Sequence, residues 1–193
     1  IKLNAASGGG SFSLQAPSSS SNNRVFTIPD IADGTIATTA TAGKILQVLQ
    51  AVKTDTFTSS ASTADITGLS VNITPSASTS KIFIIAAVNT MASNVGCTYR
   101  INGTANGDIG MGAADGSRTR GNVGDLYEAY NSPFVTHTSC FLDSPNTTNQ
   151  QTYKVVSVSA AGATMQVNRG NTDTDGSSKI RGASSITVME VGA

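Results

Sequence analysis

The sequence predicts an all-β fold, and three features carry that prediction. Short runs rich in Val, Ile and Thr either alternate between apolar and polar residues or form apolar runs of strand length. Gly, Asn, Asp and Pro, the residues that tight turns favour, separate these runs. No long amphipathic helix is expected, and the one helix that the sequence allows is a short one near Asp125 to Tyr130. Strands at this spacing are typical of an antiparallel β-sandwich, in particular a jelly roll.

The strongest core strand is predicted at Lys81 to Val88, whose sequence is KIFIIAAV. A continuous apolar run of this length is typical of a central strand that is covered on both faces. Ile45 to Lys53 is the first dense apolar run and also predicts a strand, with a short helix as the alternative because Ile45 and Leu49 are four residues apart. Further strands are expected at Val71–Ile73, Cys97–Ile101, Val135–Leu142, Tyr153–Val158, Thr164–Val167 and Ile186–Val191.

The density of apolar residues divides the chain into an N-terminal β-rich segment, residues 1–43, and a C-terminal β-sandwich head, residues 44–193. Strands are predicted at Ser11 to Ala16 and Arg24 to Ile28, but they bury too little apolar surface to fold alone. Segments below about 40 residues without disulfides or metals usually need oligomerisation. We therefore expect a homotrimer in which the N-terminal strands of three chains intertwine.

Charge is scarce and balanced in this chain. Charged residues make up 12% of the 193 residues, and 12 basic side chains cancel 12 acidic ones. Nucleic acid and anionic lipid require clustered Lys and Arg, so neither partner is expected. No run approaches the roughly 18–20 apolar residues of a membrane span, and a near-zero net charge permits self-association.

Residues with catalytic or metal-binding potential are better explained as structural. His137, the only histidine, alternates with apolar neighbours in FVTHTSCFL and is expected on a strand face. Cys97 and Cys140 are expected to be buried free thiols, with a disulfide as the alternative. Asn171 to Gly176 resembles the start of a calcium loop, but Gly182 stands where the bidentate Glu would be. The sequence therefore predicts no enzyme, cofactor or metal site.

Binding residues are expected on a long polar loop from Gly103 to Gly121. Asp115, Arg118 and Arg120 are its candidate contacts to a partner or glycan, because polar loops on a rigid β scaffold commonly carry recognition. An equally good interpretation is that this loop contacts a neighbouring subunit. The loop from Asn171 to Ser178 is a second candidate.

The segment Ser7 to Gln47 resembles a module of tail-fibre and related structural proteins of tailed phages, especially marine ones. Its pieces are an "sxxLQAP" strand, an "RxFTxPD" strand, a "DGTxAT" turn and a "GKxLQ" run. They stand here at Phe12–Pro17, Arg24–Asp30, Asp33–Thr38 and Gly43–Gln47. The remainder, notably Thr67 to Val88 and Ser184 to Val191, is similar in strand pattern to trimeric jelly-roll heads of the tumour necrosis factor and complement C1q kind.

This resemblance implies a virion structural protein, a trimeric tail-fibre or fibre-tip module that contacts other virion proteins and a host surface glycan or receptor. A capsid decoration or head-fibre protein without a receptor role is one alternative, and a monomeric carbohydrate-binding module is another. A hydrolytic tailspike would need two carboxylates that face one sugar bond, and no such pair is evident in the sequence.

Overall fold

The computed structural model describes residues 2–4, 11–13, 43–127, 134–160 and 162–192. The chain forms two compact units, Ile1–Thr38 and Thr39–Ala193. The first unit contains β1 (Lys2–Asn4) and β2 (Ser11–Ser13), an antiparallel pair with Leu3 opposite Phe12. The rest of the strand predicted from Ser11, and the one predicted at Arg24–Ile28, lie outside the described residues. Intertwining of this segment between chains stays a prediction, as does a boundary at residue 43.

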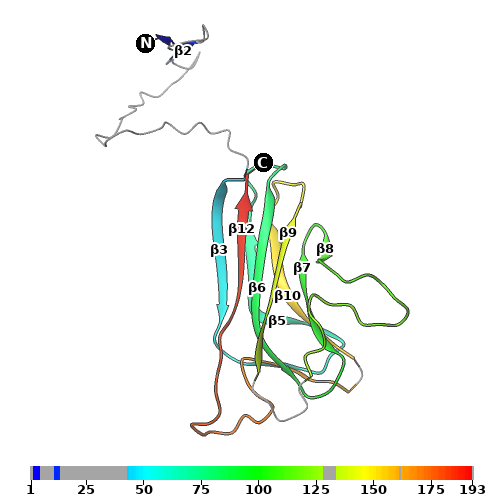
Figure 1. Cartoon of the computed structure of the whole chain (residues 1–193). Coiled ribbons are helices and arrows are strands. Elements are labelled where there is room, and N and C mark those ends of the chain that lie inside the picture. Colours follow the sequence, from blue (N-terminus) through cyan, green and yellow to red (C-terminus); the bar gives the residue numbers. More distant parts are fainter. Residues whose placement is uncertain (1, 5–10, 14–42, 128–133, 161, 193) are drawn as a thin grey trace. The chain divides into compact units, whose positions relative to one another are not determined.

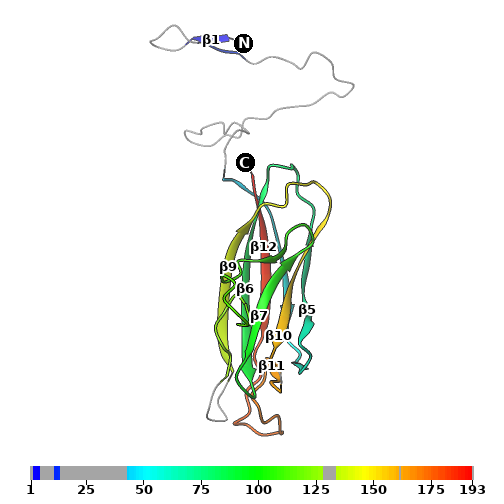
Figure 2. The same ribbon diagram turned by 90° about the vertical axis from the view of Figure 1, so that its right-hand side faces the viewer.

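The second unit consists of two antiparallel sheets, shown in Figures 1 and 2. The four-stranded sheet has the order β5 (Thr63–Ile73), β10 (Gln151–Ser159), β7 (Cys97–Gly103) and β8 (Gly107–Ile109). The six-stranded sheet has the path β3 (Ile45–Lys53), β12 (Ser184–Val191), β6 (Lys81–Ala92), β11 (Met165–Val167) and β4 (Phe57–Ser59), and β9 (Val135–Asp143) also pairs with β6.

Strand β6 organises the six-stranded sheet. It pairs with β12 through residues 81–87, with β9 through residues 82–90, and with β11 through residues 90–92. Its length of 12 residues lets β12 and β11 pair with successive parts of it. The apolar run that predicted the best core strand therefore forms the central one.

The hydrophobic core lies between the two sheets. On β6, Ile82, Ile84, Ala86 and Val88 are all fully buried, as the two-residue repeat of a strand requires. The four-stranded sheet contributes buried side chains to the same cluster, including Leu69, Tyr99, Ile101, Tyr153 and Val155. Each such side chain stabilises the fold by about 1.5–3 kcal/mol through burial. The all-β sandwich prediction is confirmed, and no helix occurs among the described residues.

The prediction that β6 is covered on both faces is wrong for the single chain. Phe83, Ile85 and Ala87, which alternate with the core residues, are only partly buried. The second face of β6 is the outer face of the sandwich, where none of the described residues forms a covering layer. At these three residues, the full burial that the sequence pattern predicts is therefore not found in the single chain.

Several local expectations are settled by the described residues. Ile45–Lys53 is a strand and not a helix turn. The short helix expected from Asp125 is not formed at residues 125–127, where Tyr127 instead makes an isolated parallel bridge to Ala92. Gly103 is the last residue of β7, and the loop predicted from Gly103 to Gly121 is interrupted by β8.

Both cysteines are free thiols, as expected, but only Cys97 is buried. The burial predicted for Cys140 is wrong, because Cys140 stands on the outer face of β9 opposite Ile85. Among the described residues, no helix is long and apolar enough to cross a membrane.

Candidate functional site

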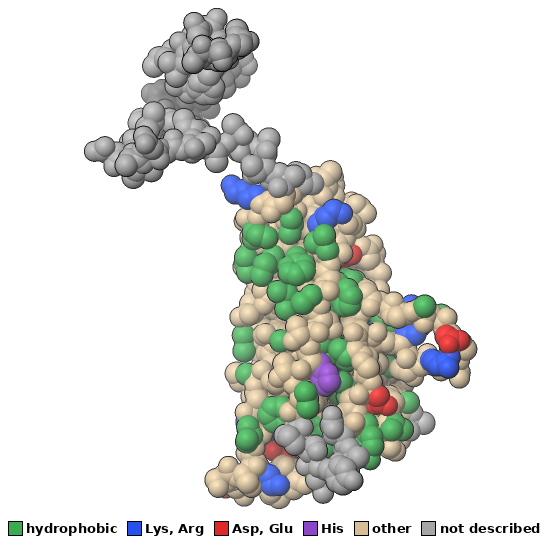
Figure 3. Space-filling view, in the orientation of Figure 1, with side chains coloured by type: hydrophobic (Ala, Val, Ile, Leu, Met, Phe, Trp, Pro, Cys, Tyr) green, Lys and Arg blue, Asp and Glu red, His purple; other side chains and the backbone are tan. Residues whose placement is uncertain are grey.

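A row of apolar side chains crosses the outer face of the six-stranded sheet. The register places Val48 opposite Met189, Met189 opposite Phe83, and Phe83 opposite Leu142. Val48 is 55% exposed and Leu142 is 54% exposed. Directly opposed residues point to the same face of a sheet, so these four side chains form one continuous strip. Figure 3 shows hydrophobic side chains gathered over this part of β3, β12 and β6.

Two further rows extend this strip along the strands. One consists of Gln50, Thr187, Ile85 and Cys140, and the next of Val52, Ser185, Ala87 and Thr138. None of the residues in the three rows is charged, and Gln50 donates a hydrogen bond to the Thr187 hydroxyl at 2.8 Å. We call the three rows together the apolar face.

The outer face of the four-stranded sheet is different in character. Lys154 pairs with Asp65 at 2.8 Å, and Arg100 pairs with Asp108 at 3.1 Å. Strand alternation places these side chains opposite to the core residues Tyr99, Ile101, Tyr153 and Val155. We call this surface the polar face. It is crossed by the loop of residues 110–121, which follows β8.

Asn122 closes the base of this loop. Its side-chain amide donates to the carbonyls of Ile109 at 2.6 Å and Gly110 at 3.0 Å, while its side-chain oxygen accepts from the Ile101 N–H at 2.5 Å. Its own N–H donates to the Tyr99 carbonyl at 2.9 Å. One side chain thereby ties both ends of the loop to β7.

Glycines allow close approach at both ends of the loop. Gly110 has a φ of 63°, and a Cβ on it would overlap the Phe141 ring. A Cβ on Gly121 would overlap the Thr98 side chain. Only glycine combines a positive φ with this lack of space at residue 110, so the loop leaves the sheet in a fixed direction.

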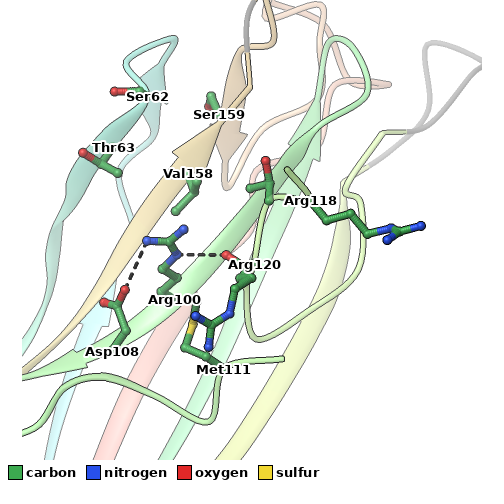
Figure 4. A pocket seen from close by; sticks show the side chains of 10 residues that line it. Ser62, Thr63, Arg100, Asp108, Met111, Arg118, Arg120, Val158 and Ser159 are labelled. Atoms are coloured by element: carbon green, nitrogen blue, oxygen red, sulfur yellow. Dashed lines mark hydrogen bonds and ion pairs between the residues drawn. The ribbon is translucent and has the colours of Figure 1, made fainter. Parts of the chain in front are cut away.

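An open hollow of about 500 Å³ lies between this loop and the polar face. Arg100 on β7 stands in its middle: its Nε donates to the Arg120 carbonyl at 2.9 Å and its Nη1 contacts Asp108 (Figure 4). Arg120 donates from Nε to the Gly112 carbonyl at 2.6 Å. The remaining lining residues are mostly hydroxyl-bearing or apolar: Ser62, Thr63, Met111, Arg118, Thr119, Val158 and Ser159.

The predicted binding residues are only partly brought together. Arg118 and Arg120 line the hollow, but Arg118 extends away from Arg100 in Figure 4. Asp115 is not among the lining residues and is ion-paired with Arg118, both side chains being over 70% exposed. Sequence reasoning missed Arg100 and Asp108. The only indication in the sequence is an arginine at an outward-facing position of the strand YRING. Its contact with the loop depends on tertiary structure.

The second predicted loop is held by its own charges. Asp173 forms ion pairs with Arg169 at 3.4 Å and with Arg181 at 2.7 Å. The first carboxylate of the motif that resembles a calcium loop is therefore engaged by two guanidinium groups. Among the described residues, no cluster of His, Cys, Asp and Glu could hold a metal ion.

The most buried carboxylate of the described residues, Glu190 on β12, is part of the framework. It accepts hydrogen bonds from the Ser76 N–H at 2.7 Å, the Ser76 hydroxyl at 2.6 Å and the Gln47 amide at 2.6 Å. Burial alone would raise the pKa of Glu190, but these hydrogen bonds outweigh burial and lower it to about 2. Glu190 thus fastens β12 and β3 to the connection between β5 and β6.

The remaining titratable groups near the core are also engaged. The Tyr99 hydroxyl lies 3.1 Å from the His137 carbonyl and 3.0 Å from the Ser139 hydroxyl, and burial raises the pKa of Tyr99 to about 12. Burial and the hydrogen bond to Asp143 raise the pKa of Tyr153 further. His137 lies on β9, the strand position expected for it. These groups connect the two sheets.

Comparison with known proteins adds no identification: no protein-family model matches the sequence, and no curated protein matches it either. Structural support for a function therefore comes from the apolar face and from the hollow on the polar face.

Proposed function

We propose that this chain is a virion structural protein of a tailed phage, a homotrimeric fibre or fibre-tip head that takes part in host attachment. The phage assignment follows from the resemblance of Ser7 to Gln47 to tail-fibre modules. The single structural observation that carries the oligomeric part is the apolar face, which the described residues of one chain leave exposed.

The order of the strands supports the jelly-roll form of the sandwich. With the short strands β4 and β11 set aside, eight strands remain, four in each sheet, in the orders β3-β12-β6-β9 and β5-β10-β7-β8. In each sheet, the strand that comes first in the sequence lies beside the strand that comes last: β3 beside β12, and β5 beside β10. Two Greek keys produce this arrangement. This is the sandwich type that the sequence resemblance implies.

A second and third copy of the chain are the occupants that best fit the apolar face. The face has no charged residue, and the 12 basic and 12 acidic side chains leave the chain with no net charge that would keep copies apart. Burial of apolar surface stabilises association by about 25 cal/mol per Å² before the costs of association. The KIFIIAAV pattern, typical of a strand covered on both faces, is satisfied once another copy covers Phe83 and Ile85.

Sedimentation equilibrium of the full chain tests this proposal. We expect a mass close to three times 19.6 kDa. The double variant Val48→Glu/Leu142→Glu places charges on the apolar face at two exposed positions, so the fold of each chain is retained. We expect its trimer to dissociate at a concentration at least about tenfold higher, because a buried unpaired charge is costly.

The matched control is Val95→Glu/Ile180→Glu, which changes side chains that are 57% and 69% exposed but lie outside the apolar face. We expect its trimer to be unaffected. A monomeric wild-type protein would contradict the proposal and favour a monomeric carbohydrate-binding module. Equal weakening in both double variants would show that the apolar face is not the interface.

Attachment is tested separately by adsorption of trimers to host cells. Replacement of Asp115, Arg118 and Arg120 by Ala should reduce adsorption if the loop contacts the host. Several weak sites on one appendage act together through effective concentration, so a small loss at each site gives a large loss of adsorption. Unchanged adsorption of folded trimers would favour a decoration protein without a receptor role.

A further inference from the structure

We propose that the hollow beneath the loop of residues 110–121 binds a sugar that carries an anionic group, a carboxylate or a phosphate ester. This deepens the proposed attachment function, on which its biological meaning rests, but the binding site itself is contained within one chain. The hollow is lined by Arg100, Arg118 and Arg120 together with a single carboxylate, that of Asp108. Arg118 is paired with Asp115 and extends away from Arg100, so Arg100 and Arg120 set against Asp108 leave one positive charge unbalanced in the hollow.

The single carboxylate is engaged by other groups. Its two oxygens accept from Arg100 at 3.1 Å and from the Asn102 amide at 2.9 Å. The guanidinium groups retain N–H donors: the hydrogen bonds of the described residues use Nε and Nη1 of Arg100, and only Nε of Arg120. The planar fork of a guanidinium group matches the oxygens of a carboxylate or phosphate. An anion in the hollow therefore finds donors that the fold does not itself use.

The rest of the lining indicates a sugar as the carrier of that anion. Ser62, Thr63, Thr119 and Ser159 offer hydroxyl groups, which can donate to and accept from sugar hydroxyls. Met111 and Val158 offer apolar atoms for the C–H face of a ring. The lining contains no aromatic side chain on which a nucleobase could stack, and such stacking dominates the binding of unpaired bases. A nucleotide is therefore the poorer fit.

The hollow is preorganised before any ligand binds. Asn122 closes the loop, Arg120 holds its beginning through Gly112, and Arg100 holds the Arg120 carbonyl. Arg100 itself stands on a strand of the rigid sheet, with its side chain 23% exposed. Little conformational freedom is lost on binding, so a small hollow can bind a small anion measurably.

Titration of the full chain, followed by amide chemical shifts in NMR, tests the proposal. The probes are a glucuronic acid oligosaccharide, glucose 6-phosphate and a neutral glucose oligosaccharide. We expect one or both anionic probes to shift amides of residues 98–102 and 110–122, and the neutral probe to leave them unchanged. The two anionic probes distinguish a carboxylate from a phosphate. Equal binding of the neutral probe, or no binding by either anion, would overturn the proposal.

Three variants test whether the anionic sugar binds in this hollow. Arg120→Gln should weaken anion binding by about tenfold, as expected for the loss of a charge-assisted contact. Arg181→Gln removes one positive charge from a different loop and should leave binding unchanged. Asp108→Asn should tighten binding several-fold, because it removes the one carboxylate of the hollow and keeps an oxygen that Arg100 can contact. Weaker binding by Asp108→Asn, or equal losses in both arginine variants, would contradict the site.

Failure of this site and failure of the proposed assembly give different results. The Val48→Glu/Leu142→Glu protein should bind the anionic sugar with unchanged affinity per chain, since the hollow lies on the polar face of a single chain. Loss of binding in that protein would mean that a neighbouring copy completes the site, and would contradict a hollow contained in one chain. The mass measurement remains independent of the titration.

Discussion

The two outer faces of the sandwich are built from strands with the same alternation, yet they present opposite chemistry. On the six-stranded sheet, the outward residues of β3, β12, β6 and β9 include three uncharged rows that contain Val48, Met189, Phe83 and Leu142. On the four-stranded sheet, the outward residues include two ion pairs and support a folded-back loop. A single chain needs only its inner faces to fold. The outer faces are therefore free to differ in chemistry, and in the proposed assembly the apolar face serves association and the polar face serves recognition.

The largest change in stability is expected at Gly110, at the base of the loop on the polar face. Gly110→Ala places a Cβ against the Phe141 ring at a positive φ, which should destabilise the fold by about 2–4 kcal/mol. Gly112→Ala is the matched control, because a Cβ there has open space and its φ is not positive. Urea unfolding of both variants measures the difference. Equal stability would mean that the loop is not fixed at its base.

The second prediction concerns Glu190, which joins the six-stranded sheet to the connection from β5. The pKa of Glu190 is lowered from 4.5 to about 2 in the fold. Its contribution to stability is therefore complete above pH 4.5 and is lost as the pH falls through 2. We expect Glu190→Gln to cost about 1–3 kcal/mol at pH 7.

Urea unfolding at several pH values between 7 and 2 checks this expectation. The difference in unfolding free energy between wild type and Glu190→Gln should shrink as the pH falls. A difference that stays constant across this range would show that the charge of Glu190 does not contribute.

The third prediction uses the two thiols as reporters of the two environments. Cys140 stands on the apolar face and is exposed in the single chain, whereas Cys97 is buried and burial raises its pKa. In the assembled protein, Cys140 should react with a thiol reagent at least about tenfold more slowly than in the Val48→Glu/Leu142→Glu protein, a difference of about 1.4 kcal/mol. Cys97 should stay unreactive in both. Fast labelling of Cys140 in a trimer would place the interface elsewhere.

The smallest effect is expected on the polar face, at the ion pair between Lys154 and Asp65. The two side chains are 33% and 59% exposed. Exposed pairs of this kind contribute about 0.2–1 kcal/mol, so Lys154→Ala should change stability by less than about 1 kcal/mol and leave the trimer mass unchanged. A loss as large as that expected for Gly110→Ala would mean that the polar face also takes part in assembly.

The sequence by itself determined where most of the strands lie. The apolar run at Lys81 to Val88 and the β-branched run at Ile186 to Val191 are local properties of the chain, and the structure places β6 and β12 close to those bounds. Because the first run is apolar throughout, it could not distinguish the inward residues of β6 from the outward ones. The three-residue strands β1, β4 and β8 were not predicted, because so short a strand gives little pattern, although β11 of the same length was.

Only the tertiary structure decided which outward residues come together. The row from Val48 to Leu142 requires the register of four strands that are far apart in the sequence. The meeting of Arg100 with Arg120 likewise requires the loop to fold back on β7. Alternation assigns a side chain to a face but not to its neighbours across the sheet, because those are set by long-range strand pairing.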